Sequence, residues 1–251
     1  MINFVGAGPG AVDLITVRGK ALLESADLII YAGSLVNKDL LQYAKPECVI
    51  MDSAQMTLEA VIEAMLPFAK EGKTVVRLHT GDPSIYGAIR EQMDILKKHQ
   101  VEYQVVPGVS SFFGAAAALK AEYTLPNVSQ TVIITRMEGR TPVPAKEEIS
   151  LLAAHQATMA IFLSSGMLDK LSERLISGGY TADTPAAIVY KATWPEEKVF
   201  HCTVGSLPET ARVNNINRTA LILVGEFLGS DYDRSLLYHP EFTHGYREGS
   251  K

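Results

Sequence analysis

The chain has 251 residues, of which 47% are hydrophobic and 20% are charged, enough to bury a core in one large domain or two modest ones. Its net charge is −5 at pH 7 and it has no dense tract of Lys and Arg, so nothing in the bulk electrostatics favours nucleic acid as a partner. No apolar run approaches the roughly 18 residues of a membrane span, and the first residues lack the basic region of a signal peptide. We therefore expect a cytoplasmic α/β protein that makes no membrane contact.

The first half of the chain alternates short apolar runs with helical patterns. Strands are expected at residues 2–5, 28–31, 49–50, 74–78 and 103–106. Helices are expected at residues 16–25, 36–43, 57–70, 85–98 and 110–119. Regular alternation of this kind predicts a mostly parallel sheet that is covered by helices on both faces.

The pattern breaks around residues 121–129, where Thr124, Pro126 and Asn127 interrupt it, and we place a domain boundary there. Further strands are expected at residues 131–135, 158–163, 186–190, 198–203 and 220–224. The third and fourth of these flank a Pro-Glu-Glu turn, which predicts a hairpin and hence a mixed sheet. The expected parts are an N-terminal α/β domain (residues 1–120), a C-terminal mixed α/β domain (121–229) and a loosely docked polar tail (230–251).

Cysteine usage is sparse. Cys48 and Cys202 lie far apart in the sequence and have no CxxC spacing. We therefore expect neither a disulfide framework nor a metal site, and a reducing compartment fits best.

Residues 6–11 read GAGPGA after a strand and satisfy the G-x-G-x-x-A pattern of dinucleotide sites. Three features argue against a dinucleotide. Pro9 lacks a backbone donor, the next helix begins no earlier than Thr16, and the second strand ends without the acid that should bind the ribose hydroxyls. The glycines then mark either a tight turn without a ligand or a site of another kind.

Two further glycine-bearing loops follow predicted strands. Residues 80–87 read TGDPSIYG, and residues 106–111 read VPGVSS. Asp82 has an alternative role as the N-cap of the following helix, and Ser110 or Ser111 as the cap of the Ala-rich helix. Because ligands of open parallel sheets bind beyond the carboxyl ends of the strands, the three loops together predict one shared small-molecule site.

In this order, the segments GAGPG, TGDPSIYG, VPGVSS and the C-terminal ALILVGE resemble the tetrapyrrole (corrin/porphyrin) methylases over nearly the whole chain. Four segments are similar to the branch that methylates C11 of precorrin-4 or cobalt-precorrin-4 in cobalamin biosynthesis: YAGSLV (31–36), TRMEGRTPVP (135–144), IFLSSGM (161–167) and YKATWPEEKV (190–199). The resemblance implies two α/β domains with a cleft between them that binds S-adenosylmethionine (SAM), with S-adenosylhomocysteine as product. It also implies a homodimer and a tetrapyrrole substrate.

By resemblance, nine residues contact the cofactor: Pro9, Thr80, Gly81, Asp82, Ile85, Ser110, Ser111, Ser164 and Ala192. Related uroporphyrinogen methylases are proposed to use an acid after the second strand and a lysine after the third. This chain has Ala32 and the Ser53-Ala54 region at those places, so the resemblance assigns no catalytic acid or base.

A tetrapyrrole substrate carries several carboxylates, which Arg binds well in a bidentate geometry. Arg136 and Arg140 are therefore candidate substrate-binding residues and Lys191 is a weaker one, the alternative for each being an ordinary surface ion pair. His79 is expected to be a satisfied residue at a strand end rather than a catalyst.

Several functions compete with methylation of precorrin-4. Another methylase of the same family, such as one acting on uroporphyrinogen III, is disfavoured by the missing acid and lysine. Methylation of a protein or of RNA ribose is disfavoured by the TRMEGRTPVP segment. A non-catalytic protein that binds SAM or a tetrapyrrole remains an alternative, because the motifs represent binding residues better than catalytic ones.

Overall fold

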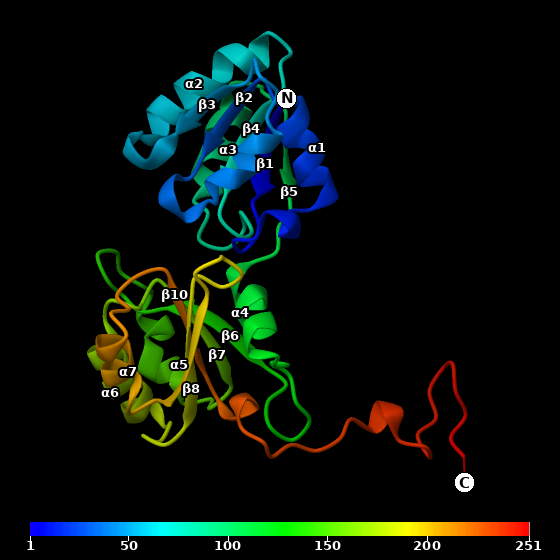
Figure 1. Cartoon of the computed structure of the whole chain (residues 1–251), viewed down its shortest axis with the longest axis vertical. Coiled ribbons are helices and arrows are strands. Elements are labelled where there is room, and N and C mark those ends of the chain that lie inside the picture. The colour runs from blue at the N-terminus through cyan, green and yellow to red at the C-terminus, as the bar shows by residue number, and fades with distance from the viewer. Residues whose placement is uncertain (251) are drawn as a thin grey trace. The chain divides into compact units, whose positions relative to one another are not determined.

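The computed structural model describes residues 1–250, with the side chain of Ser34 left out, and its contacts divide the chain into two compact units (Figure 1). The first unit comprises Met1–Ala115 together with Lys191–Glu197. The second comprises Ala116–Tyr190 together with the chain from Lys198 onward. The division into residues 1–120, 121–229 and a separate tail stays a prediction about which segments fold as units.

The first unit is built on a parallel sheet. Its five strands are β1 (Ile2–Gly6), β2 (Leu28–Tyr31), β3 (Val49–Asp52), β4 (Val75–His79) and β5 (Tyr103–Val106). They lie in the order β3-β2-β4-β1-β5, and every neighbouring pair is parallel, as the sequence predicts. Because β4, β1 and β5 are neighbours, the three glycine-bearing loops leave the same edge of the sheet side by side.

Apolar side chains cover both faces of this sheet, which explains why most residues of its central strands β1, β2 and β4 are apolar and buried. The helices of this unit are α1 (Val17–Ser25), α2 (Leu58–Lys70) and α3 (Ile89–Lys98), and α4 (Ser111–Leu119) begins in it and continues into the second unit after Ala115. One core combines Leu23 of α1 with Val5, Ile29, Val76 and Leu78. The other combines Val61, Met65 and Leu96 of α2 and α3 with Ile2, Phe4, Leu28, Ile30 and Val75.

Two predicted helices of this unit differ from the structure. The helix expected at residues 85–98 begins only at Ile89, because Tyr86 and Ala88 have left-handed backbones with φ of 56° and 49°. The segment expected as a helix at residues 36–43 forms a 3₁₀ helix at Lys38–Tyr43. The third strand also runs two residues further than expected, to Asp52.

The second unit contains a mixed sheet in the order β6-β7-β10-β8-β9. Its strands are β6 (Val132–Arg136), β7 (Thr158–Phe162), β8 (Pro185–Tyr190), β9 (Lys198–Thr203) and β10 (Ala220–Val224). Only β6 and β7 pair in parallel, and β8 and β9 form the predicted antiparallel hairpin. Three helices pack on the sheet: α5 (Ile149–Ala153), α6 (Leu168–Gly178) and α7 (Leu207–Val213).

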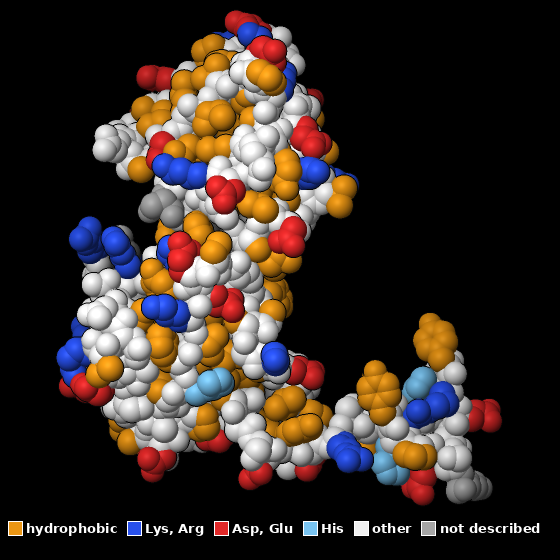
Figure 2. Space-filling model, viewed as in Figure 1, with side chains coloured by type: hydrophobic (Ala, Val, Ile, Leu, Met, Phe, Trp, Pro, Cys, Tyr) orange, Lys and Arg blue, Asp and Glu red, His pale blue; other side chains and the backbone are white. Residues whose placement is uncertain are grey.

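After β10 the chain forms two short 3₁₀ helices, at Glu226–Leu228 and Leu236–Tyr238. Among the described residues, no helix combines the length and the apolar character needed to span a membrane. On the face drawn in Figure 2, acidic and basic side chains are interspersed.

Candidate functional site

The loops after β1, β4 and β5 contact one another through glycine backbones. Gly81 N donates a hydrogen bond to Gly8 O at 2.9 Å, and Gly8 N donates to Gly81 O at 3.3 Å. A Cβ atom at Gly6 would lie 2.5 Å from Gly108 Cα, and a Cβ at Gly108 would lie 2.2 Å from Gly81 O. Side chains cannot be accommodated at these contacts, so the glycines serve the close packing of the three loops whether or not a ligand is bound.

Asp82 joins two of these loops. Its Oδ1 accepts hydrogen bonds from the Ser84 backbone N–H at 2.8 Å and from the Ser84 hydroxyl, and its Oδ2 accepts one from Gly108 N at 2.9 Å. The alternative that Asp82 caps a helix beginning at Ile85 is wrong, because α3 begins at Ile89.

The Asp82 carboxylate is ionised at neutral pH. Partial burial acts to raise the pKa of Asp82, but the hydrogen bonds from Ser84 and Gly108 outweigh this effect and hold the pKa below its ordinary value. An ionised carboxylate has about four acceptor positions, so Asp82 retains capacity for a further donor from a ligand.

Two polar side chains at the end of β4 have a buried atom without a hydrogen-bond partner among the described residues, Thr80 Oγ1 and His79 Nε2. His79 does end the strand, but the expectation that it is satisfied is wrong for Nε2. Burial, and then the charge of Arg77, lower the pKa of His79 to about 3, so its imidazole is neutral at pH 7. The Thr80 hydroxyl is a polar group that a ligand atom beside the loop would satisfy.

The remaining predicted cofactor residues of the first unit lie in or beside these loops. Pro9 is buried, and Ile85 N donates a hydrogen bond to Asp82 O at 3.2 Å. Ser110 is buried and Ser111 begins α4. A Cβ atom at Gly81 would lie 3.4 Å from both Ser110 Cα and Ser111 N, so these loops are in van der Waals contact.

Ala192 belongs to the segment between β8 and β9 that the contacts assign to the first unit. It is buried, with 7% of its surface exposed. Lys191 Nζ lies 3.5 Å from a carboxylate oxygen of Glu196 and 5.2 Å from the centre of the Trp194 ring. The predicted substrate-binding Lys191 thus has partners within its own segment.

In the second unit, Ser164 is fully buried. Its hydroxyl accepts a hydrogen bond from Met137 N at 3.0 Å and donates one to Phe162 O at 2.7 Å. Because the hydroxyl hydrogen is already used, a hydrogen bond donated to the cofactor from this residue would have to come from the main chain.

The two candidate arginines differ in their surroundings. The Arg136 guanidinium donates to the carbonyl oxygens of Met137, Thr141 and Pro142 at 3.2, 3.2 and 2.7 Å, so it supports the loop that follows β6. Arg140 is exposed in that loop and has no hydrogen bond or ion pair with the part of the chain that the structure describes. Arg140 is therefore the freer of the two to bind a substrate carboxylate.

The sequence-based expectations did not include the acid at the end of β3. Asp52 pairs in register with Tyr31, and its Oδ1 accepts a hydrogen bond from Ala54 N at 2.9 Å. Backbone hydrogen bonding, first from Ala54, lowers the pKa of Asp52. Lys38 Nζ lies 5.7 Å from the centre of the Tyr31 ring. The sequence predicts that this strand ends at residue 50, so it does not identify Asp52 as the residue at its carboxyl end. Its carboxylate places a negative charge beside Ala32 and Ser53-Ala54, which are uncharged.

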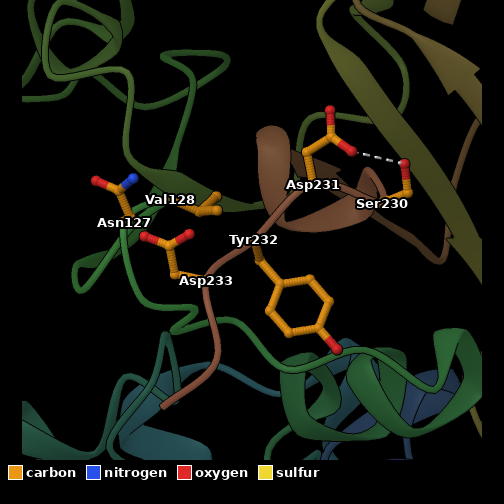
Figure 3. A pocket seen from close by; sticks show the side chains of 6 residues that line it. All are labelled: Asn127, Val128, Ser230, Asp231, Tyr232 and Asp233. Atoms are coloured by element: carbon orange, nitrogen blue, oxygen red, sulfur yellow. Dashed lines mark hydrogen bonds between the residues drawn. The ribbon is translucent and has the colours of Figure 1, made fainter. Parts of the chain in front are cut away.

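A pocket of about 470 Å³ lies in the second unit, between the segments Asn127–Val128 and Ser230–Asp233 (Figure 3). Ser230 Oγ and Asp231 Oδ1 are hydrogen bonded at 3.3 Å within it. None of the predicted cofactor residues lines this pocket. The described residues also contain no group of three or more His, Cys, Asp or Glu side chains arranged to hold a metal ion.

The model of the family Tetrapyrrole (Corrin/Porphyrin) Methylases matches residues 1–208. The cobalt-precorrin-4 C(11)-methyltransferase of Methanocaldococcus jannaschii is 54% identical over 100% of this chain and 97% of that protein. The precorrin-4 C(11)-methyltransferase of Pseudomonas aeruginosa is 43% identical over 99% of each. The X-ray structure of a cobalamin biosynthetic enzyme, cobalt precorrin-4 methyltransferase, is similar with a TM-score of 0.89 and 50% identity, covering 91% of this chain and 96% of that one.

Proposed function

Because the chain belongs to the tetrapyrrole (corrin/porphyrin) methylases, we propose that it transfers a methyl group from SAM to C11 of precorrin-4 or cobalt-precorrin-4 in cobalamin biosynthesis. The observation that carries this proposal is the similarity to C11-methyltransferases over the full length of the chain. The identity is 54% to the relative named for the cobalt substrate and 43% to the one named for the metal-free substrate. This difference favours cobalt-precorrin-4.

The first unit offers groups that suit SAM, which carries an ammonium group, a carboxylate, ribose hydroxyls and an adenine. Asp82 is an ionised acceptor beside the interlocked glycines. Thr80 has a buried hydroxyl with no partner among the described residues. The proposed cofactor contacts are Pro9, Thr80, Gly81, Asp82, Ile85, Ser110, Ser111 and Ala192, with Ser164 contributing main-chain atoms.

When bound, SAM supplies a methyl group that its sulfonium charge has already activated. The protein's task is then to position the two reactants and to match their charges. The backbones of Gly6, Gly81 and Gly108 pack directly on one another, and the bond between Asp82 and Gly108 ties two of their loops together beside the proposed cofactor contacts. For the substrate, we propose that Arg140 binds a carboxylate, with Arg136 supporting its loop and Lys191 as a second candidate.

The test is a turnover assay with labelled SAM and three acceptors: cobalt-precorrin-4, precorrin-4 and uroporphyrinogen III. We expect one labelled methyl group per molecule on a precorrin-4 substrate, with the cobalt form preferred. Robust methylation of uroporphyrinogen III and none of either precorrin-4 form would refute the assignment. If SAM raised the melting temperature but no acceptor was methylated, a non-catalytic SAM-binding protein would be favoured instead.

We also propose that the protein is a cytoplasmic homodimer, as the family resemblance implies. Sedimentation of the purified protein measures its oligomeric state directly. A single species with the mass of one 27.3 kDa chain at micromolar concentration would contradict the dimer.

A further inference from the structure

The first glycine-bearing loop is bound by side chains that are remote from it in sequence. Three successive residues of the loop, Pro9, Gly10 and Ala11, each form a backbone hydrogen bond with one of these side chains. The bonds run from Trp194 Nε1 to Pro9 O at 3.1 Å, from Asn37 Nδ2 to Gly10 O at 2.9 Å, and from Ala11 N to Thr193 Oγ1 at 3.0 Å. The loop has no regular secondary structure here, so these three bonds constrain its backbone where no helix or strand does.

Two of the three side chains belong to Lys191–Glu197, here called the arm, which is part of the first unit. The Trp194 ring lies directly on Gly10, because a Cβ atom there would be 2.1 Å from Trp194 Cδ1. A Cβ at Gly114 would be 2.8 Å from Pro9 Cβ and 3.2 Å from Thr193 Cγ2. The arm, the first loop and α4 are therefore closely packed.

The arm has a conformation that local preferences alone do not favour. Lys191 and Thr193 have left-handed backbones with φ of 47° and 69°, which are uncommon for residues other than glycine, and most of all for a β-branched one. Thr193 N donates to the Glu197 carboxylate at 2.6 Å, and Trp194 N donates to Lys191 O at 3.0 Å. These bonds and the contacts with the first loop hold the arm in this form.

We propose that Asn37, Thr193 and Trp194 are positioning residues that hold the backbone of residues 9–11 in the conformation that binds SAM. This inference rests on the proposed function, in which Pro9 contacts the cofactor. Their polar atoms are already bonded to the loop, so their effect on SAM is transmitted through the loop backbone. Losing one bond frees a Pro9, Gly10 or Ala11 backbone group to rotate toward water, and SAM binding must then restore the original conformation.

At each position a variant removes the bond and keeps the shape or a second contact of the original side chain. Asn37→Asp replaces the donor to Gly10 O by a carboxylate oxygen that cannot donate and that repels the carbonyl, but it keeps the oxygen that accepts from Asp39 N at 3.0 Å. Thr193→Val loses the acceptor for Ala11 N but keeps the branched shape, and Thr193→Ser restores the hydroxyl. Trp194→Phe loses the Nε1 donor but keeps an aromatic ring over Gly10.

The experiment measures the SAM dissociation constant by calorimetry, together with kcat and the melting temperature, for the full-length protein. Thr193→Val and Trp194→Phe should each weaken SAM binding about two- to tenfold, the range for one neutral hydrogen bond. Asn37→Asp, which also sets a charge against Gly10 O, should weaken it at least as much. Thr193→Ser should remain within about twofold of the original protein, and kcat at saturating SAM should change less than the affinity. Glu196→Gln, on the exposed side of the arm, is the matched control and should leave SAM affinity unchanged.

If SAM affinity were unchanged in Asn37→Asp and Thr193→Val, the positioning role would be overturned, even if the melting temperatures were lower. The bonds would then stabilise the fold without affecting cofactor binding. Failure of the proposed function is seen separately, in the unsubstituted protein, as no binding of SAM or as no methylation of either precorrin-4 form. Trp194 is the single tryptophan of the chain, so its fluorescence gives a second readout. SAM should change the emission of the unsubstituted protein, and Asn37→Asp should shift that titration to higher SAM concentration.

Discussion

Asp82 Oδ2 accepts a hydrogen bond from the backbone N–H of Gly108 at 2.9 Å, so the carboxylate proposed to contact the cofactor also ties the loop after β4 to the loop after β5. A single side chain thereby serves both the fold and the proposed site. Substitutions at this position must be judged by stability and by affinity together.

Asp82→Ala is expected to lower the free energy of unfolding by about 1–2 kcal/mol, because it removes charge-assisted hydrogen bonds that are partly exposed to solvent. It should also weaken SAM binding, measured by calorimetry on the folded variant. Ser84→Ala, which removes only the hydroxyl bond within the loop, is the control and should lose much less affinity. Lower stability with unchanged SAM affinity would leave Asp82 a purely structural role.

Thr80→Val tests the unpartnered hydroxyl. Because Thr80 Oγ1 is buried without a partner among the described residues, replacing it by a methyl group should leave the SAM-free protein as stable or slightly more stable. SAM affinity should fall, because the ligand then meets no hydroxyl there, and Thr80→Ser should restore it. A marked drop in the melting temperature of SAM-free Thr80→Val would contradict the absence of a partner.

Gly108→Ala tests the packing of the three loops. The added Cβ would lie 2.2 Å from Gly81 O, and overpacking of this kind typically costs about 1–3 kcal/mol. Chemical denaturation should therefore show a lower unfolding free energy, with SAM affinity reduced as well. Gly245→Ala is the control, because a Cβ there meets nothing within 4 Å. Equal stability of the two variants would rule out tight packing at Gly108.

The pH dependence of stability has a specific origin in His79, whose pKa is lowered from 6.5 to about 3 by burial and by Arg77. Below pH 6.5 the unfolded chain binds a proton on this residue that the folded chain does not, so the folded state loses stability as the pH falls from 6.5 toward 3. His79→Gln cannot titrate and should show a flatter profile of melting temperature over this interval. Parallel profiles of the two proteins would exclude His79 as a cause.

The sequence predicts the sheet of the first unit well because its information is local. The apolar runs that become β1, β4 and β5 are separated by helical patterns, and parallel topology then brings the loops that follow them to one edge. In the second unit, the turn between β8 and β9 is also a local signal. It predicts that these two strands pair antiparallel and hence that the sheet is mixed.

Details that depend on particular backbone conformations and hydrogen bonds could not be predicted. Ile85 fits the apolar spacing of a helix, but the left-handed backbones of Tyr86 and Ala88 delay the start of α3. Arg136 is of the residue type that binds substrate carboxylates, but in the structure its guanidinium donates hydrogen bonds to carbonyl oxygens of the following loop. The bond between Trp194 and Pro9 joins residues 185 positions apart, which no local pattern reveals.

The most direct test of the proposed reaction is the position of the transferred methyl group. The purified protein is incubated with cobalt-precorrin-4 and isotope-labelled SAM, and nuclear magnetic resonance locates the label in the isolated product. The label is predicted at C11 of the macrocycle. A label on any other ring carbon, or recovery of the substrate unmethylated from active, SAM-binding protein, would contradict the proposed function.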